Sequence, residues 1–185
     1  NEIHNVDGII SNLTPTDVSE KEIETLKSCI DHMRLTLEDF NIISDEKEAD
    51  EFNLGRLMSS LEMLHRNNFK REKINFQINY ENASKEIVIK QHFRKILQLF
   101  NNLIINSIKA LKCGVNKQIF IKINANDERI TLYICDNGCG ILKENREKIF
   151  TPYFTTTGGS GIGLTHVKHV LDEIGGVISL VESND

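Results

Sequence analysis

The chain has 185 residues, of which 39% are hydrophobic and 26% are charged, and its formal net charge is −5. This length can supply one ordinary domain with a smaller second unit, and this composition is typical of a globular protein rather than of a disordered or fibrous one. The negative net charge argues against a broad basic surface for a phosphate backbone, so we expect no nucleic acid partner.

Neither the cysteines nor the apolar runs of the sequence indicate a metal centre or a membrane segment. Cys29, Cys113, Cys135 and Cys139 include no CxxC pair and have no histidine at zinc-ligand spacing, so we interpret them as reduced thiols. No apolar run reaches the roughly 20 residues that cross a bilayer, and no signal-peptide pattern opens the chain. We expect a cytoplasmic fragment without membrane contact, and a parent protein anchored in the inner membrane upstream is compatible with it.

Residues 1–44 are predicted to form a helical hairpin. The second helix repeats apolar residues at alternating steps of three and four, as a heptad seam does, at Ile23, Leu26, Ile30, Met33, Leu37 and Phe40. The same spacing precedes it at Ile3, Val6, Ile10 and Leu13. Ser19 and Glu22 form a capping box at the start of the second helix. We expect an antiparallel hairpin that dimerises into a four-helix bundle, and an intramolecular docking surface is the alternative.

A second domain is predicted at 51–185, after an acidic linker. Its expected elements are a helix at 54–66, strands at 74–79 and 86–89, a helix at 90–112, strands at 117–124 and 130–136, a helix at 161–174 and a strand at 177–182. Helices that pack on an antiparallel or mixed sheet make this an α+β domain, a two-layer α/β sandwich.

The helix expected at 90–112 carries three polar side chains on one face. Asn102, Asn106 and Lys109 stand at i, i+4 and i+7, and the apolar residues around them supply the core face. We therefore expect the polar stripe to point away from the core. A carboxamide oxygen can bind magnesium and a lysine can contact phosphate, although a solvated stripe explains this segment alone more simply.

The residues DNGCGI at 136–141 form a glycine-containing turn after a predicted strand. Gly138 and Gly140 let the backbone turn tightly and approach a planar ligand. The carboxylate of Asp136 can accept a hydrogen bond from an amino group such as adenine N6. An ordinary Asp-Asn-Gly turn explains the same residues equally well.

A second glycine-rich stretch, GGSGIGL at 158–164, leads directly into a predicted helix. The free N–H groups and the positive dipole end of a helix N-terminus suit a phosphate group. The stretch lacks the leading strand of a dinucleotide-binding fingerprint and the GK[ST] ending of a P-loop. Both of those nucleotide-binding motifs are therefore disfavoured.

In order, spacing and flanking residues, the chain resembles the histidine kinase branch of the GHKL, or Bergerat-fold, ATPases. NLIINSIKA resembles the N box, DNGCGI the G1 box, IFTPYF the F box and GSGIGL the G2 box. The resemblance implies the Bergerat ATP-binding fold for 51–185, with ATP and Mg2+ as ligands. It further implies a sensor histidine kinase of two-component signal transduction, which autophosphorylates on histidine and passes the phosphate to an aspartate of a response-regulator receiver domain.

Carried over by position, the resemblance implies that Asn106 ligates magnesium, Asp136 binds the adenine amino group and Lys109 lies near the phosphates. Further nucleotide contacts are implied for Gly138, Gly140, Ile141, Phe150, Phe154, Thr156, Gly159, Gly161, Gly163 and Leu164. Asn102 stands where hydrolysing relatives carry a water-activating glutamate. Its amide favours phosphoryl transfer over hydrolysis.

The expected phosphoacceptor box departs from the family pattern. NEIHNVDGII aligns with the common His-Glu-Ile-x-Asn-Pro-Leu-Gly-Ile-Ile form in a register that puts Asn1 at the acceptor position. Glu2 and Asn5 would then assist transfer and dephosphorylation, whereas the other register makes His4 the acceptor. Two functions stay open: an autophosphorylating kinase, and an ATP-binding pseudokinase, phosphatase or scaffold for the response regulator that lacks the acceptor histidine.

Overall fold

The computed structural model describes residues 49–112, 114–156 and 159–181. Its elements are β1 (Glu51–Asn53), α3 (Leu54–Glu72), β2 (Asn75–Tyr80), β3 (Val88–Lys90), α4 (Phe93–Ala110), β4 (Gln118–Ala125), β5 (Ile130–Asp136), the short 3-10 helix η1 (Lys143–Asn145) and α5 (Gly163–Glu173). The predicted hairpin at 1–44 lies outside the described residues.

The main sheet has three strands in the order β2-β4-β5. It is a mixed sheet, because β2 runs parallel and β5 antiparallel to the central strand β4. Alternate residues of β4 point to one face of a sheet, and its isoleucines at 119, 121 and 123 are completely buried. β1 and β3 form a separate antiparallel pair.

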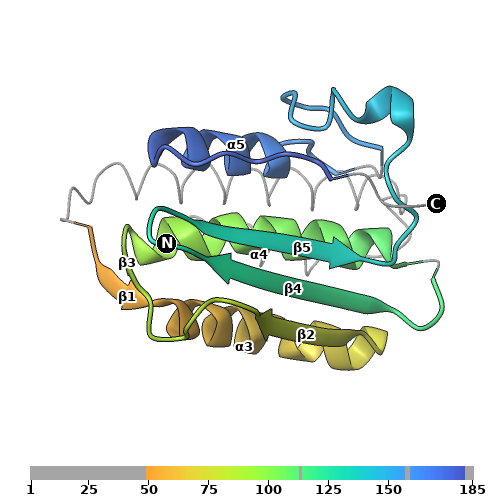
Figure 1. Cartoon of the computed structure of the whole chain (residues 1–185). Helices are drawn as coiled ribbons and strands as arrows, with labels where there is room; N and C mark the ends of the chain where they lie inside the picture. The colour runs from red at the N-terminus through yellow and green to blue at the C-terminus, as the bar shows by residue number, and fades with distance from the viewer. Residues whose placement is uncertain (1–48, 113, 157–158, 182–185) are drawn as a thin grey trace, which may run out of the picture. The chain divides into compact units, whose positions relative to one another are not determined.

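Helices α3, α4 and α5 form a second layer behind this sheet, with α4 in the middle (Figure 1). The two-layer α/β sandwich predicted from the sequence is therefore confirmed. The parallel connection from β2 to β4 passes through β3 and α4, as a parallel pair requires a long crossover. This crossover helix, α4, is the element that carries the polar stripe.

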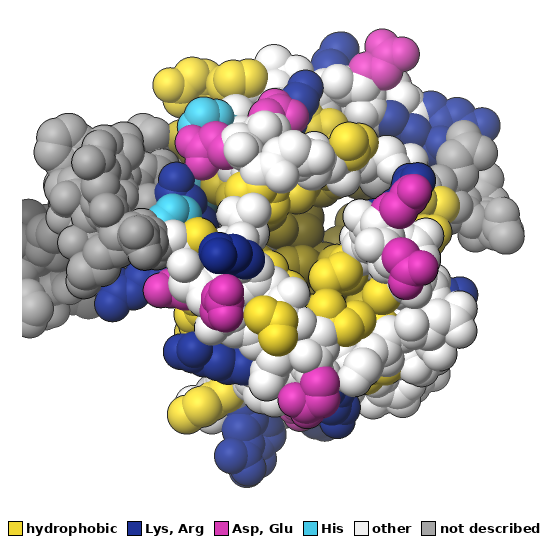
Figure 2. Space-filling model, turned by 60° about the vertical axis from the view of Figure 1, so that its left-hand side comes forward, with side chains coloured by type: hydrophobic (Ala, Val, Ile, Leu, Met, Phe, Trp, Pro, Cys, Tyr) yellow, Lys and Arg dark blue, Asp and Glu magenta, His cyan; other side chains and the backbone are white. Residues whose placement is uncertain are grey.

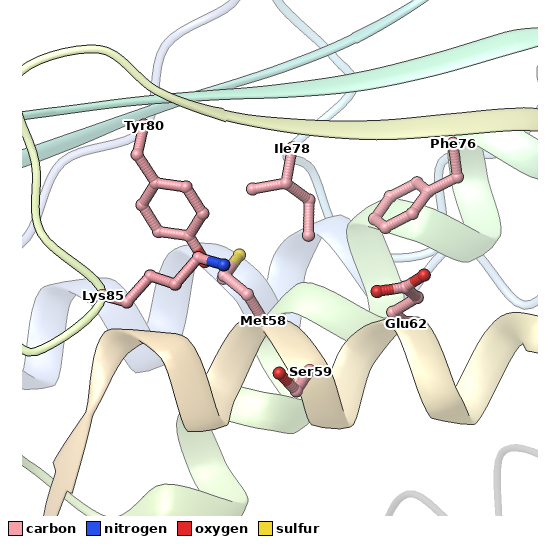
Figure 3. Close-up of a pocket in the computed structure, with 7 residues that line it drawn as sticks. All are labelled: Met58, Ser59, Glu62, Phe76, Ile78, Tyr80 and Lys85. Atoms are coloured by element: carbon pink, nitrogen blue, oxygen red, sulfur yellow. The ribbon is translucent and has the colours of Figure 1, made fainter.

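In the space-filling view, charged side chains are spread over the outer surface of the molecule, and hydrophobic side chains gather inside a hollow (Figure 2). One measured cavity, of about 230 Å³, lies between α3 and β2. Phe76, Ile78 and Tyr80 line it from the strand, above Met58, Ser59 and Glu62 of the helix (Figure 3).

None of the helices in the described part of the chain combines the length and the apolar character that crossing a membrane requires.

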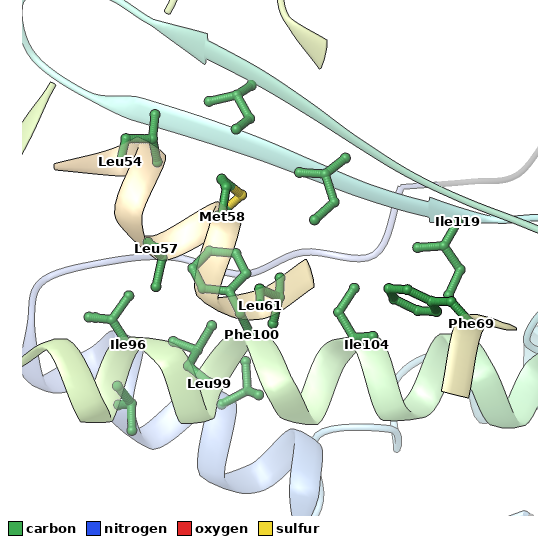
Figure 4. Close-up of a cluster of buried hydrophobic side chains, with 14 of the residues drawn as sticks. Leu54, Leu57, Met58, Leu61, Phe69, Ile96, Leu99, Phe100, Ile104 and Ile119 are labelled. Atoms are coloured by element: carbon green, nitrogen blue, oxygen red, sulfur yellow. The ribbon is translucent and has the colours of Figure 1, made fainter. Parts of the chain in front are cut away.

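The hydrophobic core lies between the two layers (Figure 4). Leu54 and Leu61 of α3, Ile104 of α4 and Ile119 of β4 are fully buried in it. Asn53 caps the start of α3, since its Oδ1 accepts a hydrogen bond of 2.7 Å from the backbone N–H of Arg56. The helix runs past the predicted end at residue 66, because buried Phe69 continues its apolar face.

The strand predicted at 177–182 is wrong for its described part, residues 177–181, which join no described sheet. The alternation in VISLV predicts which side chains face the core, and Ile178 does pack against it. A strand also needs a backbone partner, and β5 pairs with β4 alone among the described strands. Val177 is 90% exposed and Val181 is 65% exposed, so this segment buries little apolar surface.

Candidate functional site

The polar stripe of α4 runs from a buried end to a solvent-exposed end. Asn102 is only 7% exposed, Asn106 is half-buried and Lys109 is exposed. The solvated stripe, which this segment alone favoured, is therefore wrong for Asn102. The reason is that α5 covers this end of the stripe: a Cβ added to Gly163 would lie 3.7 Å from Oδ1 of Asn102.

The glycine-rich segment before α5 lies against the same stripe. A Cβ on Gly159 would be 3.3 Å from Nζ of Lys109, so the ammonium group lies beside this backbone. The N–H of Gly159 donates a hydrogen bond of 3.2 Å to Oγ1 of Thr155, a residue that the sequence analysis did not single out. Helix α5 follows at Gly163, and no side chain of the described residues caps its N-terminus. Its free N–H groups and positive dipole end therefore remain available to an anion.

The turn after β5 packs onto the C-terminal end of α4. The N–H of Cys139 donates a hydrogen bond of 3.1 Å to the carbonyl of Ala110. A Cβ on Gly138 would come within 2.7 Å of the backbone of Ala110, so only glycine fits there. Gly140 has φ +68, a left-handed backbone conformation that favours glycine.

Asp136 stands exposed at the end of β5 and opens this turn. Its Oδ1 accepts a hydrogen bond of 3.0 Å from the N–H of Gly138, which fixes the direction of the carboxylate. An ionised carboxylate has capacity for further donors. Asp136 can therefore accept a hydrogen bond from the amino group of a planar ligand.

Asn137 has a structural role that its sequence position did not reveal. Its Oδ1 accepts a hydrogen bond of 2.7 Å from the N–H of Gln118, and its Nδ2 donates one of 3.0 Å to the carbonyl of Asn116. The side chain thereby ties the turn after β5 to the loop before β4. The Asn-Gly pair predicts a local turn, but it does not predict hydrogen bonds to residues about twenty positions away.

The predicted F box is joined to the glycine-rich segment. The N–H of Tyr153 donates a hydrogen bond of 3.1 Å to the carbonyl of Gly161. A Cβ on Gly161 would lie 2.4 Å from the carbonyl carbon of Tyr153, so glycine is required at this contact as well. Tyr153 itself adopts a left-handed backbone with φ 65, which a tyrosine rarely does.

The other predicted contact residues surround these segments. Phe150 and Phe154 are half-buried, as is Leu164, whereas Thr156 is exposed and Ile141 is 37% exposed. Oγ1 of Thr165 donates a hydrogen bond of 3.4 Å to the carbonyl of Phe150, which links the start of α5 to the F box. The residues predicted at the phosphoacceptor site, Asn1, Glu2, His4 and Asn5, lie outside the described residues.

Helix α3 contains a buried histidine. His65 is 2% exposed, and neither of its ring nitrogens has a hydrogen-bond partner among the described residues. Burial lowers the pKa of His65. The imidazole is therefore neutral over a wider pH range than an exposed one.

The arrangement fits a ligand with a planar head and an anionic tail. Nδ2 of Asn102 is buried without a hydrogen-bond partner among the described residues, so the site has an unused donor. Lys109 and the uncapped start of α5 supply positive charge for the tail.

A metal ion would have few protein ligands in the described part of the chain. There, no three or more His, Cys, Asp or Glu side chains are grouped so as to hold one. Magnesium usually keeps waters and shares its remaining oxygens with a phosphate ligand. The carboxamide oxygen of Asn106, next to Lys109 on the stripe, suits such a site.

Comparisons with known proteins match the part of the chain that contains these segments. The family model described as "Histidine kinase-, DNA gyrase B-, and HSP90-like ATPase" matches residues 91–185. Sensor histidine kinase ZraS of Salmonella typhimurium is 34% identical over 90 residues, which are 46% of this chain and 18% of ZraS. Nitrogen regulation protein NtrY of Azorhizobium caulinodans is 34% identical over 93 residues, 47% of this chain and 12% of NtrY. The chain spans less than a fifth of the length of these relatives.

Solved structures give a similar result. The catalytic domain of histidine kinase ThkA matches with a TM-score of 0.61 at 29% identity, over 69% of this chain and 82% of that domain. ThkA in complex with the response regulator protein TrrA matches 95% of this chain and 53% of that chain, with a TM-score of 0.59 and 24% identity. At this lower identity the second likeness concerns the fold alone.

Proposed function

The chain belongs to the family of histidine kinase-, DNA gyrase B- and HSP90-like ATPases, and from this premise we propose that it is the ATP-binding core of a sensor histidine kinase. One observation carries the proposal: the C-terminal half of α4 meets both the Asp136 turn and the glycine-rich segment. A base-reading carboxylate, a lysine and a helix N-terminus are thereby gathered around one helix end.

In the proposed complex, Asp136 accepts a hydrogen bond from the adenine amino group. The phosphates lie along the stripe of α4, where Lys109 and the N-terminus of α5 stabilise their negative charge. Asn106 holds a magnesium ion, which when bound neutralises phosphate charge. The buried Nδ2 of Asn102 gains an acceptor in this state, which it lacks among the described residues.

The proposed reaction is phosphoryl transfer to histidine. The bond between the γ-phosphorus and the bridging oxygen of ATP breaks, which leaves ADP, and a bond forms between phosphorus and an imidazole nitrogen. Asn102 cannot take a proton from water, because an amide is not a base at neutral pH. In the second step the bond between phosphorus and the imidazole nitrogen breaks, which frees the histidine, and phosphorus bonds to a carboxylate oxygen of a response-regulator aspartate. In this proposal residues 1–44 form the dimerisation and acceptor hairpin.

A second candidate rests on Asn1. If the register that places Asn1 at the acceptor position is correct, the chain lacks a nucleophilic imidazole there. It then binds ATP without labelling itself and acts as a pseudokinase, scaffold or phosphatase, with Glu2 and Asn5 assisting dephosphorylation of the partner. Incubation with γ-labelled ATP separates the two: label on His4 supports the kinase, and an unlabelled chain with bound ATP supports the second candidate.

The nucleotide site is tested by the variant Asp136→Asn. It retains an oxygen for the N–H of Gly138 but replaces a charged acceptor by a neutral amide, and one charge-assisted hydrogen bond corresponds to about 10- to 100-fold in affinity. We expect ATP affinity, measured by calorimetry, to fall by that factor. The matched control is Asp127→Asn in the turn between β4 and β5, which should bind normally. Unchanged affinity of Asp136→Asn would contradict the proposed site.

A further inference from the structure

The outer edge of β2 is unpaired among the described strands. In the sheet order β2-β4-β5, strand β2 stands at the end. The N–H groups of Asn75 and Glu81 donate toward the β4 side, to the carbonyls of Lys117 and Ile123, at 2.9 and 3.0 Å. Residues alternate along a strand, so the even-numbered positions 76, 78 and 80 direct their backbone groups to the outer edge.

Within the described residues, this edge lacks several of the features that usually keep sheet edges apart. Edge strands in monomeric proteins are commonly protected by lysine, proline, a bulge or a covering segment. Residues 74–80, INFQINY, contain no charge and no proline. The uninterrupted register of β2 against β4, from Asn75 to Tyr80, leaves no bulge there either. The edge is therefore suited to accept another strand.

A groove runs beside this edge, on the helix side of the sheet. It is the cavity of about 230 Å³ between β2 and α3, and Met58, which is 1% exposed, belongs to its lining. Phe76, Ile78 and Tyr80 are only half-buried above it. A strand added to β2 would direct every second side chain to the same side of the sheet.

The two ends of the groove carry opposite charges. Lys85 stands at the Tyr80 end, with its ammonium 5.4 Å from the centre of the tyrosine ring, and Glu62 stands at the Phe76 end (Figure 3). Both residues are exposed. The backbone of Lys85 is held in place, because its carbonyl accepts a hydrogen bond of 2.8 Å from the N–H of Gly55 on α3.

We propose that β2 pairs with β2 of a second copy of this chain, antiparallel, about a two-fold axis at Ile78. A two-fold contact brings the same surface of both copies together with reversed direction. Ile78 then lies opposite Ile78 of the second copy, and Phe76 lies opposite Tyr80. The reversal also brings Lys85 of one copy toward Glu62 of the other, so the groove is complementary in charge to itself. This contact is independent of the nucleotide site.

Cysteine cross-linking tests the register of this pairing. Gln77 and Asn79 are exposed on the solvent face of β2 and lie opposite each other across the proposed axis. A mixture of full-length Gln77→Cys and Asn79→Cys chains should form a disulfide between positions 77 and 79 under mild oxidation. Each variant alone should form at least fivefold less, because identical positions are offset by two residues and are too far apart.

The linked peptide is identified by mass spectrometry, which separates it from links through the exposed Cys135 and Cys139. A mixture that yields no more 77–79 link than the background of the single variants would overturn the proposal. That outcome would also follow if the edge takes a strand from a different protein. Circular dichroism checks that both variants are folded.

Charge reversal gives a second, independent measurement. Glu62→Lys and Lys85→Glu each place like charges opposite one another, and the two-fold axis repeats the contact twice. Each should weaken the 77–79 cross-linking by about fivefold or more. The double variant restores opposite charges and should recover most of the loss. If the double variant loses as much cross-linking as the two single variants lose together, the proposed pairing is overturned.

Discussion

The N–H of Cys139 lies 3.1 Å from the carbonyl oxygen of Ala110 and donates a hydrogen bond to it. Ala110 is the last residue of α4, where a carbonyl has no partner within its own helix. The turn after β5 supplies that partner. The bond therefore holds the turn that begins at Asp136 against the end of the helix that carries Lys109.

Gly138→Ala should disrupt this contact between the turn and α4. The new Cβ would lie 2.7 Å from the backbone of Ala110, which cannot rotate away as a side chain can. We expect a loss of about 1–3 kcal/mol in the free energy of unfolding, measured by urea denaturation, together with weaker ATP binding. Gly114→Ala is the control, because its nearest neighbour is 3.6 Å away and it should unfold normally. Equal stability of the two variants would mean that the turn can move off α4.

Asn102→Ala should separate the stability of the fold from ligand binding. Nδ2 of Asn102 is buried without a partner among the described residues, and such a group costs about 1–3 kcal/mol. Its removal should leave the free energy of unfolding without ATP unchanged or higher. The rise in melting temperature on adding ATP and magnesium should become smaller. Asn82→Ala, in the exposed loop after β2, should change neither quantity. A destabilised Asn102→Ala with full ATP response would refute the assignment.

Tyr153→Asn should stabilise the protein. Tyr153 has φ 65, which costs a residue with a bulky side chain about 1–2 kcal/mol, whereas asparagine adopts this conformation readily. The ring is 74% exposed, so little packing is lost. Thermal unfolding should show a gain of about 0.5–1 kcal/mol. Lys73→Asn at φ 54 provides a second position for the same effect, and a loss at both would rule out backbone strain.

His65 should make stability depend on pH. Burial lowers its pKa below the ordinary value of 6.5, so the unfolded chain binds a proton there at a pH where the folded protein does not. The free energy of unfolding should therefore fall as the pH drops from about 6.5 to the lowered pKa, and its contribution should level off below that value. His65→Leu should remove this part of the slope in denaturation curves measured between pH 5 and 7.5. An unchanged slope would show that His65 is accessible to protons.

Regular patterns in the sequence predicted much of this fold. The alternating isoleucines Ile119 and Ile121 predict a buried face of the strand from this segment alone, and both are buried in the structure. The burial of Asn102 could not be predicted in that way, since it depends on α5, which is about sixty positions away along the chain. The three-residue strand β1 is too short to carry a period.

The glycines of the site illustrate a second limit. Their spacing indicated a nucleotide, but the reason why each must be glycine appears only in three dimensions. Gly161 is required because the backbone of Tyr153 presses against it, and Gly138 because Ala110 does. These contacts link segments whose sequences give no sign of their proximity. The turn anchor Asn137 was missed for the same reason.

The close approach of Gly138 to Ala110 also bears on how this protein can evolve. A Cβ on residue 138 would stand 2.7 Å from the existing Cβ of Ala110 as well as from its backbone. The contact with the backbone is present whatever side chain stands at position 110, so no substitution there makes room for a larger residue at 138. Saturation mutagenesis should therefore find position 138 restricted to glycine.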